Sequence, residues 1–416
     1  MTPDIEVFID FAAGLRRVGT LRGYVRRGHA TATFEYQEDW LGAREGFSLE
    51  PALTLTAGTF ASGADRSLLG SIGDSAPDTW GRQLMQRAER RRAAQEGRTV
   101  RTLSELDYLL GVSDLSRLGA LRLRRVGEQQ FQAPITSGIP GLLALGQLLQ
   151  VTQRLARDEE SDDDLRLIFA PGSSLGGARP KASVIDAQGR LSIAKFPKAS
   201  DGYRLELWEA VALGLANRAG INTSVHELVN VDGAPVLLSA RFDRNGATRV
   251  PYLSALSMLG LNDGDRASYP ELVDVLTQHG ARAAEDAREL FRRMVLNVLI
   301  SNVDDHLRNH GFLWSGTAGW RLAPVFDLNP TPVDVRPRIL TTTISLEDGT
   351  CDIDLVESVA EYFGLSPVVA RAEIARVGAA VATWKSLADD LGASRAEIQR
   401  MASAFEHKDL DRATRN

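Results

Sequence analysis

The segment Leu296–Asp327 constrains this chain more than any other, because it joins an apolar helix to a polar loop and a short hairpin. Apolar residues at helical spacing predict a buried helix that ends near Ser301. The loop that follows reads N-V-D-D-H-L-R-N over residues 302–309, and we expect the second strand of the hairpin to deliver Asp327. Loops held by a rigid scaffold are where reactive side chains gather. The alternative is a polar loop without a catalytic role, which contains a capping Asp and a strand-terminal turn.

Asp304 and Asn309 stand five residues apart, which is the spacing D-x-x-x-x-N of the protein-kinase catalytic loop. In that chemistry the Asp accepts the proton of the attacking hydroxyl, while the Asn and a later Asp hold magnesium on the phosphates. A hard cation such as Mg²⁺ prefers carboxylate and amide oxygens together with phosphate oxygens. Asn309 and Asp327 are therefore the candidate metal ligands, and Asp304 is the candidate catalytic base.

Length and composition set the outer limits. A chain of 416 residues is too long for one core and predicts two or three domains. The hydrophobic fraction of 44% and charged fraction of 25% are those of an ordinary globular protein. A single cysteine, the absence of a signal-like N-terminus and the absence of long apolar runs favour a cytoplasmic protein that does not enter membranes. The net charge of −6 argues against the whole surface binding nucleic acid.

A second constellation is the stretch A-P-G-S-S-L-G-G-A-R-P-K over residues 170–181. Its glycines allow backbone N–H groups to approach phosphate oxygens closely, although it is neither a P-loop nor the kinase G-x-G-x-x-G. A flexible loop between a helix and a hairpin is the alternative. The strand that follows ends in I-A-K-F-P and presents Lys195, where kinases place the lysine that pairs with phosphates and with a helix glutamate. Glu206 and Glu209 are the candidates for that glutamate, and an exposed helix glutamate is the alternative for either.

Periodicity and turn residues predict the remaining elements. The expected strands are Ile5–Phe8, Ala30–Tyr36, Gly119–Arg124, Lys181–Ile185, Leu191–Phe196, Val225–Val229 and Pro235–Phe242, with a hairpin at Leu15–Gly23. The expected helices are Asp78–Glu96, Leu103–Leu110, Leu142–Arg157, Leu205–Arg218, Tyr269–His279, Ala281–Ser301, Val356–Phe363 and Ser366–Leu391. The acidic run Asp158–Asp164 is expected at a surface helix junction.

The helix Asp78–Glu96 has an unusual run of arginines: Arg82, Arg87, Arg90, Arg91 and Arg92. Such a run is most often a solvated helix face, and a phosphate- or partner-binding face is the alternative.

The order of these features predicts the architecture. Glycine loop, strand lysine, helix glutamate, D-x-x-x-x-N and a strand-end Asp follow one another as they do in kinases. We therefore expect an α+β fold with a bilobal protein-kinase-like core, in which a small β-rich lobe precedes a larger helical lobe, after an N-terminal α/β accessory domain. The expected boundaries are 1–126, 127–245 and 246–416. The strand that ends near Ala240 and Phe242 would lead into a hinge whose backbone binds adenine.

These residues resemble the HipA-like serine/threonine kinases, toxins of bacterial type II toxin–antitoxin modules. The matching stretches of the core are S-S-L-G-G-A-R-P-K-A (173–182), I-A-K-F-P (193–197), L-L-S-A-R-F-D-R (237–244), N-V-D-D-H-L-R-N (302–309) and L-A-P-V-F-D-L-N-P (322–330). The N-terminal part is similar to the family's accessory domain through V-G-T-L (18–21), F-E-Y-Q-E-D-W-L (34–41), D-S-A-P-D-T-W-G-R (74–82) and G-A-L-R-L (119–123). The resemblance covers nearly the whole chain.

The resemblance implies a role for each matching residue. Asp304 would be the catalytic base, Asn309 and Asp327 the magnesium ligands, and Ser174 the autophosphorylated serine, with Glu209 pairing Lys195. The ATP-binding residues would be Gly176, Gly177, Ala178, Arg179, Lys181, Lys195, Ala240, Phe242, His306, Asn309 and Asp327. The chain departs from the family at Ala240, where many members carry Glu, so only a backbone contact is expected there. A phosphate on Ser174 would repel bound ATP and push the loop outward.

The function that follows is transfer of the ATP γ-phosphoryl group, with Mg²⁺, to a serine or threonine hydroxyl of a protein. The resemblance suggests an aminoacyl-tRNA synthetase or another translation factor as the substrate. It also suggests a helix-turn-helix antitoxin as partner, with operator DNA bound only through that complex, where the arginine-rich helix 82–92 would touch phosphates. Two alternatives stay open: a catalytically weak kinase-fold scaffold acting in operon repression, and a small-molecule kinase.

Overall fold

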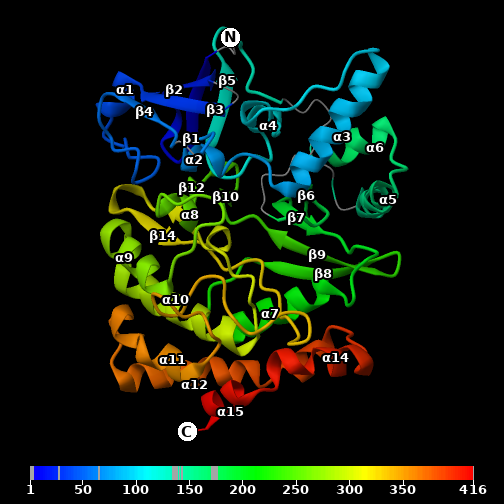
Figure 1. The fold of residues 1–416 in the computed structure, drawn as a ribbon, viewed down its shortest axis with the longest axis vertical. Helices are drawn as coiled ribbons and strands as arrows, with labels where there is room; N and C mark the ends of the chain where they lie inside the picture. Colours follow the sequence, from blue (N-terminus) through cyan, green and yellow to red (C-terminus); the bar gives the residue numbers. More distant parts are fainter. Residues whose placement is uncertain are drawn as a thin grey trace. The chain divides into compact units, whose positions relative to one another are not determined.

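The computed structural model describes residues 4–26, 29–63, 66–133, 139, 141, 144–169 and 177–415 (Figure 1). The residues group into two compact units. The first contains Met1–Ser200, Val231–Ala234 and Leu238–Leu253, and the second contains Asp201–Asn230, Pro235–Leu237 and Ser254–Asn416. The domain boundaries predicted at 126 and 245 stay predictions.

The first unit begins with a five-stranded antiparallel sheet in the order β4-β3-β2-β1-β5 (Figure 1). Its strands and adjoining short helices are β1 (Ile5–Phe11), β2 (Gly14–Arg26), β3 (His29–Tyr36), α1 (Glu38–Leu41), β4 (Thr59–Ala61), α2 (Gly70–Gly73) and β5 (Leu121–Arg125). Alternate residues of β1 are buried, as a sheet with one covered face requires. The hairpin expected within Leu15–Gly23 is wrong: these residues lie in the single strand β2, and the turn precedes Gly14, whose φ of 89° suits glycine.

Three helices of the first unit lie side by side: α3 (Thr79–Gln95), α5 (Leu145–Ala156) and α6 (Asp162–Phe169) (Figure 1). Helix α3 begins at the N-cap Asp78, where the sequence predicts the helix to start. The shorter helix α4 (Glu105–Gly111) follows with a capping box formed by Ser104 and Asp107.

The expectation of a solvated arginine face on α3 is only partly met. Arg82 forms a bidentate ion pair with Glu105 at 2.6 and 2.7 Å, and its guanidinium stacks over the Tyr108 ring at 4.6 Å. Arg87 and Arg91 both pair with Glu160, at 3.1 and 3.5 Å. Arg90 and Arg92 are exposed. The acidic run is likewise less superficial than expected, because Glu160 and Asp164 are buried and Asp164 pairs with Arg154.

Strands β6 (Lys181–Ile185), β7 (Leu191–Lys195), β9 (Ala234–Ala240) and β8 (His226–Val231) form a four-stranded sheet in that order. Strands β6 and β7 form an antiparallel hairpin in which Lys181 stands opposite Lys195. The small strands β10 (Arg244–Asn245) and β11 (Thr248–Arg249) form a separate pair. The predicted strands are confirmed to within a few residues, since their alternation is a local signal.

The second unit is mostly helical and contains most of a three-stranded sheet in the order β12-β13-β14. Its elements and the strand leading into it are α7 (Leu205–Arg218), β12 (Tyr252–Ser254), α8 (Ala255–Met258), α9 (Tyr269–His279), α10 (Ala283–Leu299), η2 (Leu307–Asn309), β13 (Gly311–Trp314), η3 (Gly316–Ala318), β14 (Trp320–Leu322), α11 (Ile353–Ser358), η4 (Ala360–Phe363), α12 (Pro367–Val381), α13 (Trp384–Asp390), α14 (Arg395–Phe405) and α15 (Lys408–Thr414). The helix expected over Ser366–Leu391 is two helices, α12 and α13.

Helix α10 forms the centre of the second unit. It is buried from Met294 to Leu299, and α9, α12 and α15 pack against it (Figure 1). Helix α7 is buried along most of its length, with Trp208 in a cluster of aromatic rings with Trp384 and Phe405. Within the residues that the structure covers, no helix is both long and apolar enough to cross a bilayer.

Candidate active site

The catalytic-loop sequence begins where α10 ends. Ser301 follows the helix with a φ of 52°, a left-handed conformation that is uncommon for a residue with a side chain and costs about 1–3 kcal/mol. Contacts from distant segments hold it there. The Ser301 hydroxyl donates to the Ala404 carbonyl at 2.9 Å and accepts from Arg338 Nε at 3.0 Å. The turn that releases the loop from the helix is therefore maintained by tertiary contacts.

The two adjacent carboxylates of the loop have opposite environments. Asp305 is buried, and its Oδ2 accepts from the Tyr269 hydroxyl at 2.6 Å and from Asn297 Nδ2 at 3.1 Å. Its Oδ1 accepts from the Thr342 backbone N–H at 3.3 Å. Burial, and next the charge of Asp305, raises the pKa of Tyr269 well above its ordinary value, so the tyrosine stays a hydrogen-bond donor. Asp305 is thus a structural anchor of the loop.

Asp304 points the other way and its side chain is 53% exposed. Its Oδ1 pairs with Arg336 Nη1 at 2.9 Å. Its backbone carbonyl accepts from Asn309 Nδ2 at 3.1 Å and from the His306 N–H at 2.9 Å. The amide nitrogen of Asn309 is therefore occupied, which leaves its Oδ1 as the atom suited to a cation. Asp304 and Asn309 are brought together within the same loop, as the five-residue spacing predicts.

A chain of asparagines connects this loop to Asp327. Asn302 Nδ2 donates to Asn297 Oδ1 at 2.9 Å, and Asn302 Oδ1 accepts from the Asn329 N–H at 3.1 Å. Asn329 Nδ2 in turn donates to the Asp327 carbonyl at 3.2 Å. The catalytic loop and the segment with the second carboxylate are therefore anchored to one another through side-chain amides.

Asp327 does not lie on a strand, which corrects the expectation that the hairpin would deliver it there. Strand β14 ends at Leu322, because Pro324 has no N–H to continue a ladder. Val325 is instead held by a hydrogen bond from its N–H to the Asn222 carbonyl at 2.8 Å. Asp327 then adopts a φ of 59°, the second strained non-glycine residue of this site. Local strain at both Ser301 and Asp327 is typical of functional positions.

In the first unit, the described end of the glycine loop is tied to α3. Gly177 has a φ of 91°, and a Cβ there would lie 3.1 Å from Lys181 Nζ. The Gly177 carbonyl accepts from the Trp80 N–H at 3.3 Å, and Trp80 Nε1 donates to the Lys181 carbonyl at 3.1 Å. Ala178 is exposed, its carbonyl accepts from Lys198 Nζ at 3.1 Å, and Arg179 is half-buried. Ser174 and Gly176, the other predicted residues of this loop, lie outside the described residues.

The two lysines of the hairpin differ because Asp78 forms an ion pair with one of them, Lys181. Lys181 and Lys195 stand directly opposite, so their side chains share one face of the sheet, where like charges are unfavourable. Lys181 is buried and pairs with Asp78 Oδ2 at 2.9 Å, while Asp78 Oδ1 caps α3 by accepting from the Gly81 N–H at 2.7 Å. The Lys181 ammonium thus serves an ion pair within the unit. Lys195 is half-buried at the end of β7.

The remaining predicted residues lie on α7 and in residues 240–244, the segment predicted to be the hinge and called the hinge sequence below. Ala240 ends β9, and the next N–H, of Arg241, donates to the Leu191 carbonyl at 2.9 Å. The Phe242 ring lies 6.1 Å from that of Tyr252. Glu206 and Glu209 are both buried in α7, so the alternative of an exposed helix glutamate is wrong. The pairing of Glu209 with Lys195 stays a prediction.

A buried ion-pair cluster holds the hinge sequence. Arg241 Nε donates to Asp243 Oδ1 at 2.6 Å, Arg244 Nη1 donates to Oδ2 at 2.7 Å, and the Gly119 N–H also donates to Oδ2 at 2.6 Å. Burial by itself would raise the pKa of Asp243, but the charges of Arg241 and Arg244 outweigh it and bring the pKa to about 2. Asp243 is therefore ionised and joins the hinge to the strand that begins at Leu121.

In each unit, some residues that hold the predicted site residues were given no role by the sequence reasoning. They are Asp78 and Trp80 in the first unit and Asn329 and Arg336 in the second. Asp78 and Trp80 lie in the stretch D-S-A-P-D-T-W-G-R, which carried the resemblance but was given no role. For Arg336 no local signal exists, because its partner is 32 residues away.

Comparison with solved structures defines the fold. The chain matches a chain of the complex of HipA, HipB and operator DNA from Shewanella oneidensis MR-1 with a TM-score of 0.70 and 15% identity, over 99% of this chain and 96% of that chain. It therefore has the HipA kinase fold along its whole length, which confirms the predicted α+β fold class. The Helicobacter pylori proinflammatory kinase CtkA matches with a lower TM-score of 0.42, at 19% identity, over 57% of this chain and 89% of that chain.

Sequence comparison then gives the family. Residues 173–404, more than half of the chain, match the model of the HipA-like C-terminal domain. The chain belongs to the HipA-like family. A Haemophilus influenzae (strain Rd) protein named "Putative kinase" is 30% identical over 86 residues, which are 21% of this chain and 24% of that protein. The match thus spans about a quarter of the length of that relative.

Proposed function

We propose that this protein is an ATP-dependent kinase that phosphorylates a serine or threonine hydroxyl of a protein. The observation that carries the proposal is the contrast between Asp304 and Asp305. One carboxylate is buried in hydrogen bonds that hold the loop, and the other is presented to solvent beside Asn309. A general base must be accessible and held in position, and Asp304 meets both conditions.

The chemistry assigns a step to each group. Asp304 accepts the proton of the substrate hydroxyl as that oxygen attacks the γ-phosphorus. The bond from the γ-phosphorus to the bridging oxygen breaks, and ADP leaves. The oxygens of Asn309 and Asp327 suit Mg²⁺, which would neutralise charge on the phosphates. Lys195 would bind the phosphates from the sheet, while the backbone near Ala240 and Phe242 would bind the adenine. Positioning and charge stabilisation account for most catalysis of this kind.

The decisive experiment measures phosphate transfer with purified full-length protein, Mg-ATP labelled at the γ-phosphate, and cell lysate. Wild type is compared with Asp304→Asn and with the control Asp334→Asn, which removes another exposed aspartate that pairs with an arginine. Labelled proteins with wild type and the control, but not with Asp304→Asn, are the expected result. Labelling of metabolites and of no protein would favour a small-molecule kinase. No transfer at saturating Mg-ATP would favour a scaffold without catalysis.

We further propose that the kinase acts as a toxin that inactivates itself and is neutralised by a helix-turn-helix antitoxin. The S. oneidensis complex, which contains HipA, HipB and operator DNA, supports such a partner. Operator DNA would then be bound only through the complex with the antitoxin. Induction of wild type should slow growth, and Asp304→Asn should not. Ser174 should become phosphorylated only in active protein, and mass spectrometry of the 173–181 peptide tests this. An aminoacyl-tRNA synthetase is one candidate substrate, and phosphoproteomics after brief induction would identify it.

A further inference from the structure

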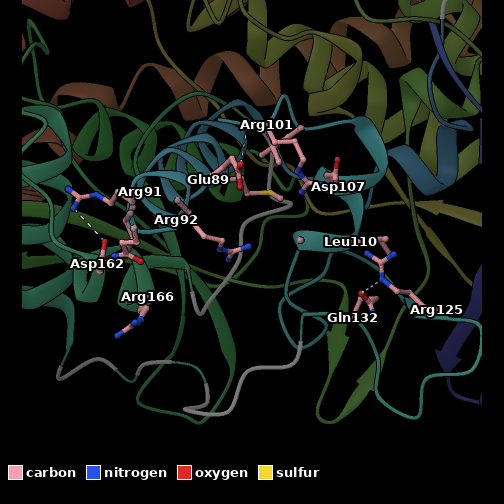
Figure 2. A pocket seen from close by; sticks show the side chains of 16 residues that line it. Glu89, Arg91, Arg92, Arg101, Asp107, Leu110, Arg125, Gln132, Asp162 and Arg166 are labelled. Carbon is pink, nitrogen blue, oxygen red and sulfur yellow. Dashed lines mark hydrogen bonds and ion pairs between the residues drawn. The ribbon is translucent and has the colours of Figure 1, made fainter. Parts of the chain in front are cut away.

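A concave pocket of about 440 Å³ lies in the first unit, and none of the residues that line it is assigned to phosphate transfer (Figure 2). One wall is a face of α3, from Met85 to Gln95. The others come from α4 and the segment before it, from α6, and from Arg125 at the end of β5. A pocket of this size accommodates a small molecule, since ligand sites in proteins are typically about 300–1,000 Å³.

The charge of the pocket is positive. Five guanidinium groups line it, against three carboxylates. The cations are Arg91, Arg92, Arg101, Arg125 and Arg166, and the anions are Glu89, Asp107 and Asp162. Residues outside the lining pair with both signs: Arg98 with Glu89 at 2.6 Å, Glu160 with Arg91 at 3.5 Å, and Asp163 with Arg166 at 3.0 Å. The surplus of cations is therefore a property of the lining itself, in a chain whose net charge is −6. Clustered guanidinium groups in a concavity are suited to bind carboxylate or phosphate oxygens with paired hydrogen bonds.

Several of these cations are only lightly committed to other partners. Arg92 is exposed and forms no ion pair within the described part of the chain. Arg101 pairs with Asp107 at 3.2 Å, but its side chain is 59% exposed, and ion pairs of that kind contribute little. Arg125 donates to the neutral amide oxygen of Gln132 at 3.1 Å and forms only a long ion pair, of 3.9 Å, with the half-exposed Glu128. Figure 2 shows Arg92 and Arg125 reaching toward the same space from opposite sides. These donors can turn to a ligand without leaving a buried acid unpaired.

The lining of the pocket also contains apolar side chains. Leu110 and Leu165 are buried, and Leu103 and Met85 complete the surface. Met85 fits because residue 111 is glycine: a Cβ at Gly111 would lie 2.1 Å from the Met85 Cε. A ligand that fills this pocket therefore needs an apolar body as well as anionic groups.

We propose that this pocket binds a small phosphate-bearing ligand of nucleotide size, with phosphates on Arg92 and Arg101 and the apolar body on the leucines. A concave site differs from what a nucleic-acid backbone requires, because a duplex contacts cations spread along an open surface. The pocket therefore gives the N-terminal part of the chain a ligand-binding role that is separate from phosphate transfer.

Calorimetric titration of the full-length protein tests the proposal. The background variant is Asp327→Ala without magnesium, so that nucleotide binding at the kinase residues is suppressed. The probes are inorganic pyrophosphate and ADP at about physiological ionic strength. Both should bind, ADP more tightly. The double substitution Arg92→Gln and Arg101→Gln should weaken both by about tenfold or more. Arg157→Gln, which removes an exposed arginine outside the pocket, should change neither.

Hydrogen exchange provides a readout in the folded protein. Pyrophosphate should slow amide exchange in the peptides of α3 and α4 in the background variant, and not in the double variant. Absence of pyrophosphate binding at millimolar concentration would overturn the proposal, as would equal weakening by Arg157→Gln. ADP binding no tighter than pyrophosphate would overturn the role of the leucines. Tighter binding of citrate would overturn the phosphate class, and binding of duplex DNA in place of pyrophosphate would assign the arginines to nucleic acid.

Discussion

The hinge sequence and the catalytic loop are both polar segments that a buried aspartate holds in place, but the groups that bind the two carboxylates differ. Asp243 at the hinge is surrounded by Arg241 and Arg244, whereas Asp305 in the catalytic loop accepts from Tyr269 and other neutral donors. A carboxylate between two cations strongly prefers its charged form. A carboxylate that is bound by neutral donors is stabilised less in its charged form. Removing that carboxylate, however, leaves no arginine buried without a counter-charge. The comparison predicts that the two regions fail differently when perturbed.

The largest effect is expected when each of the two adjacent carboxylates of the loop is replaced separately by an amide. Asp304→Asn should lower the rate of phosphate transfer by about 10²–10⁴-fold, because proton transfer loses its base. Its free energy of unfolding should change by less than about 0.5 kcal/mol, since the side chain is exposed. Asp305→Asn should instead act mainly on stability and lower the free energy of unfolding by about 1.5–3 kcal/mol. Kinetics and denaturant unfolding of both variants check this, and equal effects on the two readouts would contradict the division of roles.

Removing the carboxylate of the hinge should be the most destabilising single change. Asp243→Ala leaves Arg241 and Arg244 buried without their anion, which costs about 3–5 kcal/mol. Urea unfolding measures the loss. Asp389→Ala, at an exposed position of α13, is the control and should stay within about 0.5 kcal/mol of wild type. A loss below about 1 kcal/mol for Asp243→Ala would show that the ion pairs contribute little beyond their desolvation cost.

Acid should affect the hinge through the same carboxylate. The pKa of Asp243 is lowered from 3.8 to about 2 in the folded protein. The unfolded state therefore binds this proton first as the pH falls. The contribution is complete above about pH 4 and is lost between pH 4 and 2, by about 2 kcal/mol. Unfolding free energies measured across this range should fall more steeply for wild type than for Asp243→Asn. Parallel curves would contradict the assignment.

The neutral network of the catalytic loop should respond more mildly. Tyr269→Phe removes the hydroxyl that donates to Asp305 at 2.6 Å and accepts from Asn297 Nδ2 at 2.8 Å. The expected loss is about 1–3 kcal/mol, because one hydrogen bond to a charged group disappears while other donors to Asp305 remain. Thermal unfolding measures it. A loss as large as that of Asp243→Ala would remove the distinction between the two regions.

The smallest effect on stability is expected from Arg336→Gln. The ion pair with Asp304 is more than half exposed on both sides, so its loss should change the free energy of unfolding by about 0–1 kcal/mol. Arg400→Gln, which breaks the exposed pair with Asp334, is the matched control. A destabilisation well above that of the control would show that the segment around Arg336 is held by this pair.

Much of the fold follows from local patterns in the sequence. Helix α9 was predicted at its observed bounds, because the Ser268 cap, Pro270 and the apolar period are all local signals. The hairpin of β6 and β7 and the helix α7 followed in the same way. The strand that was predicted to end at Asp327 could not be derived in this way, because Pro324 stops the ladder and Val325 pairs with a distant segment. Long-range pairing cannot be derived from a period of two or 3.6 residues.

The sequence by itself determined the family, the order of the elements and the spacing of Asp304 and Asn309, since each depends on residues close together in the chain. The tertiary structure decided which of two neighbouring aspartates is buried and which is exposed. It also decided that Lys181 pairs with Asp78 and that Arg336 pairs with Asp304. These outcomes depend on contacts between residues 32 to 103 positions apart. Such contacts exist only once the chain has folded, because burial and proximity are properties of the packed molecule.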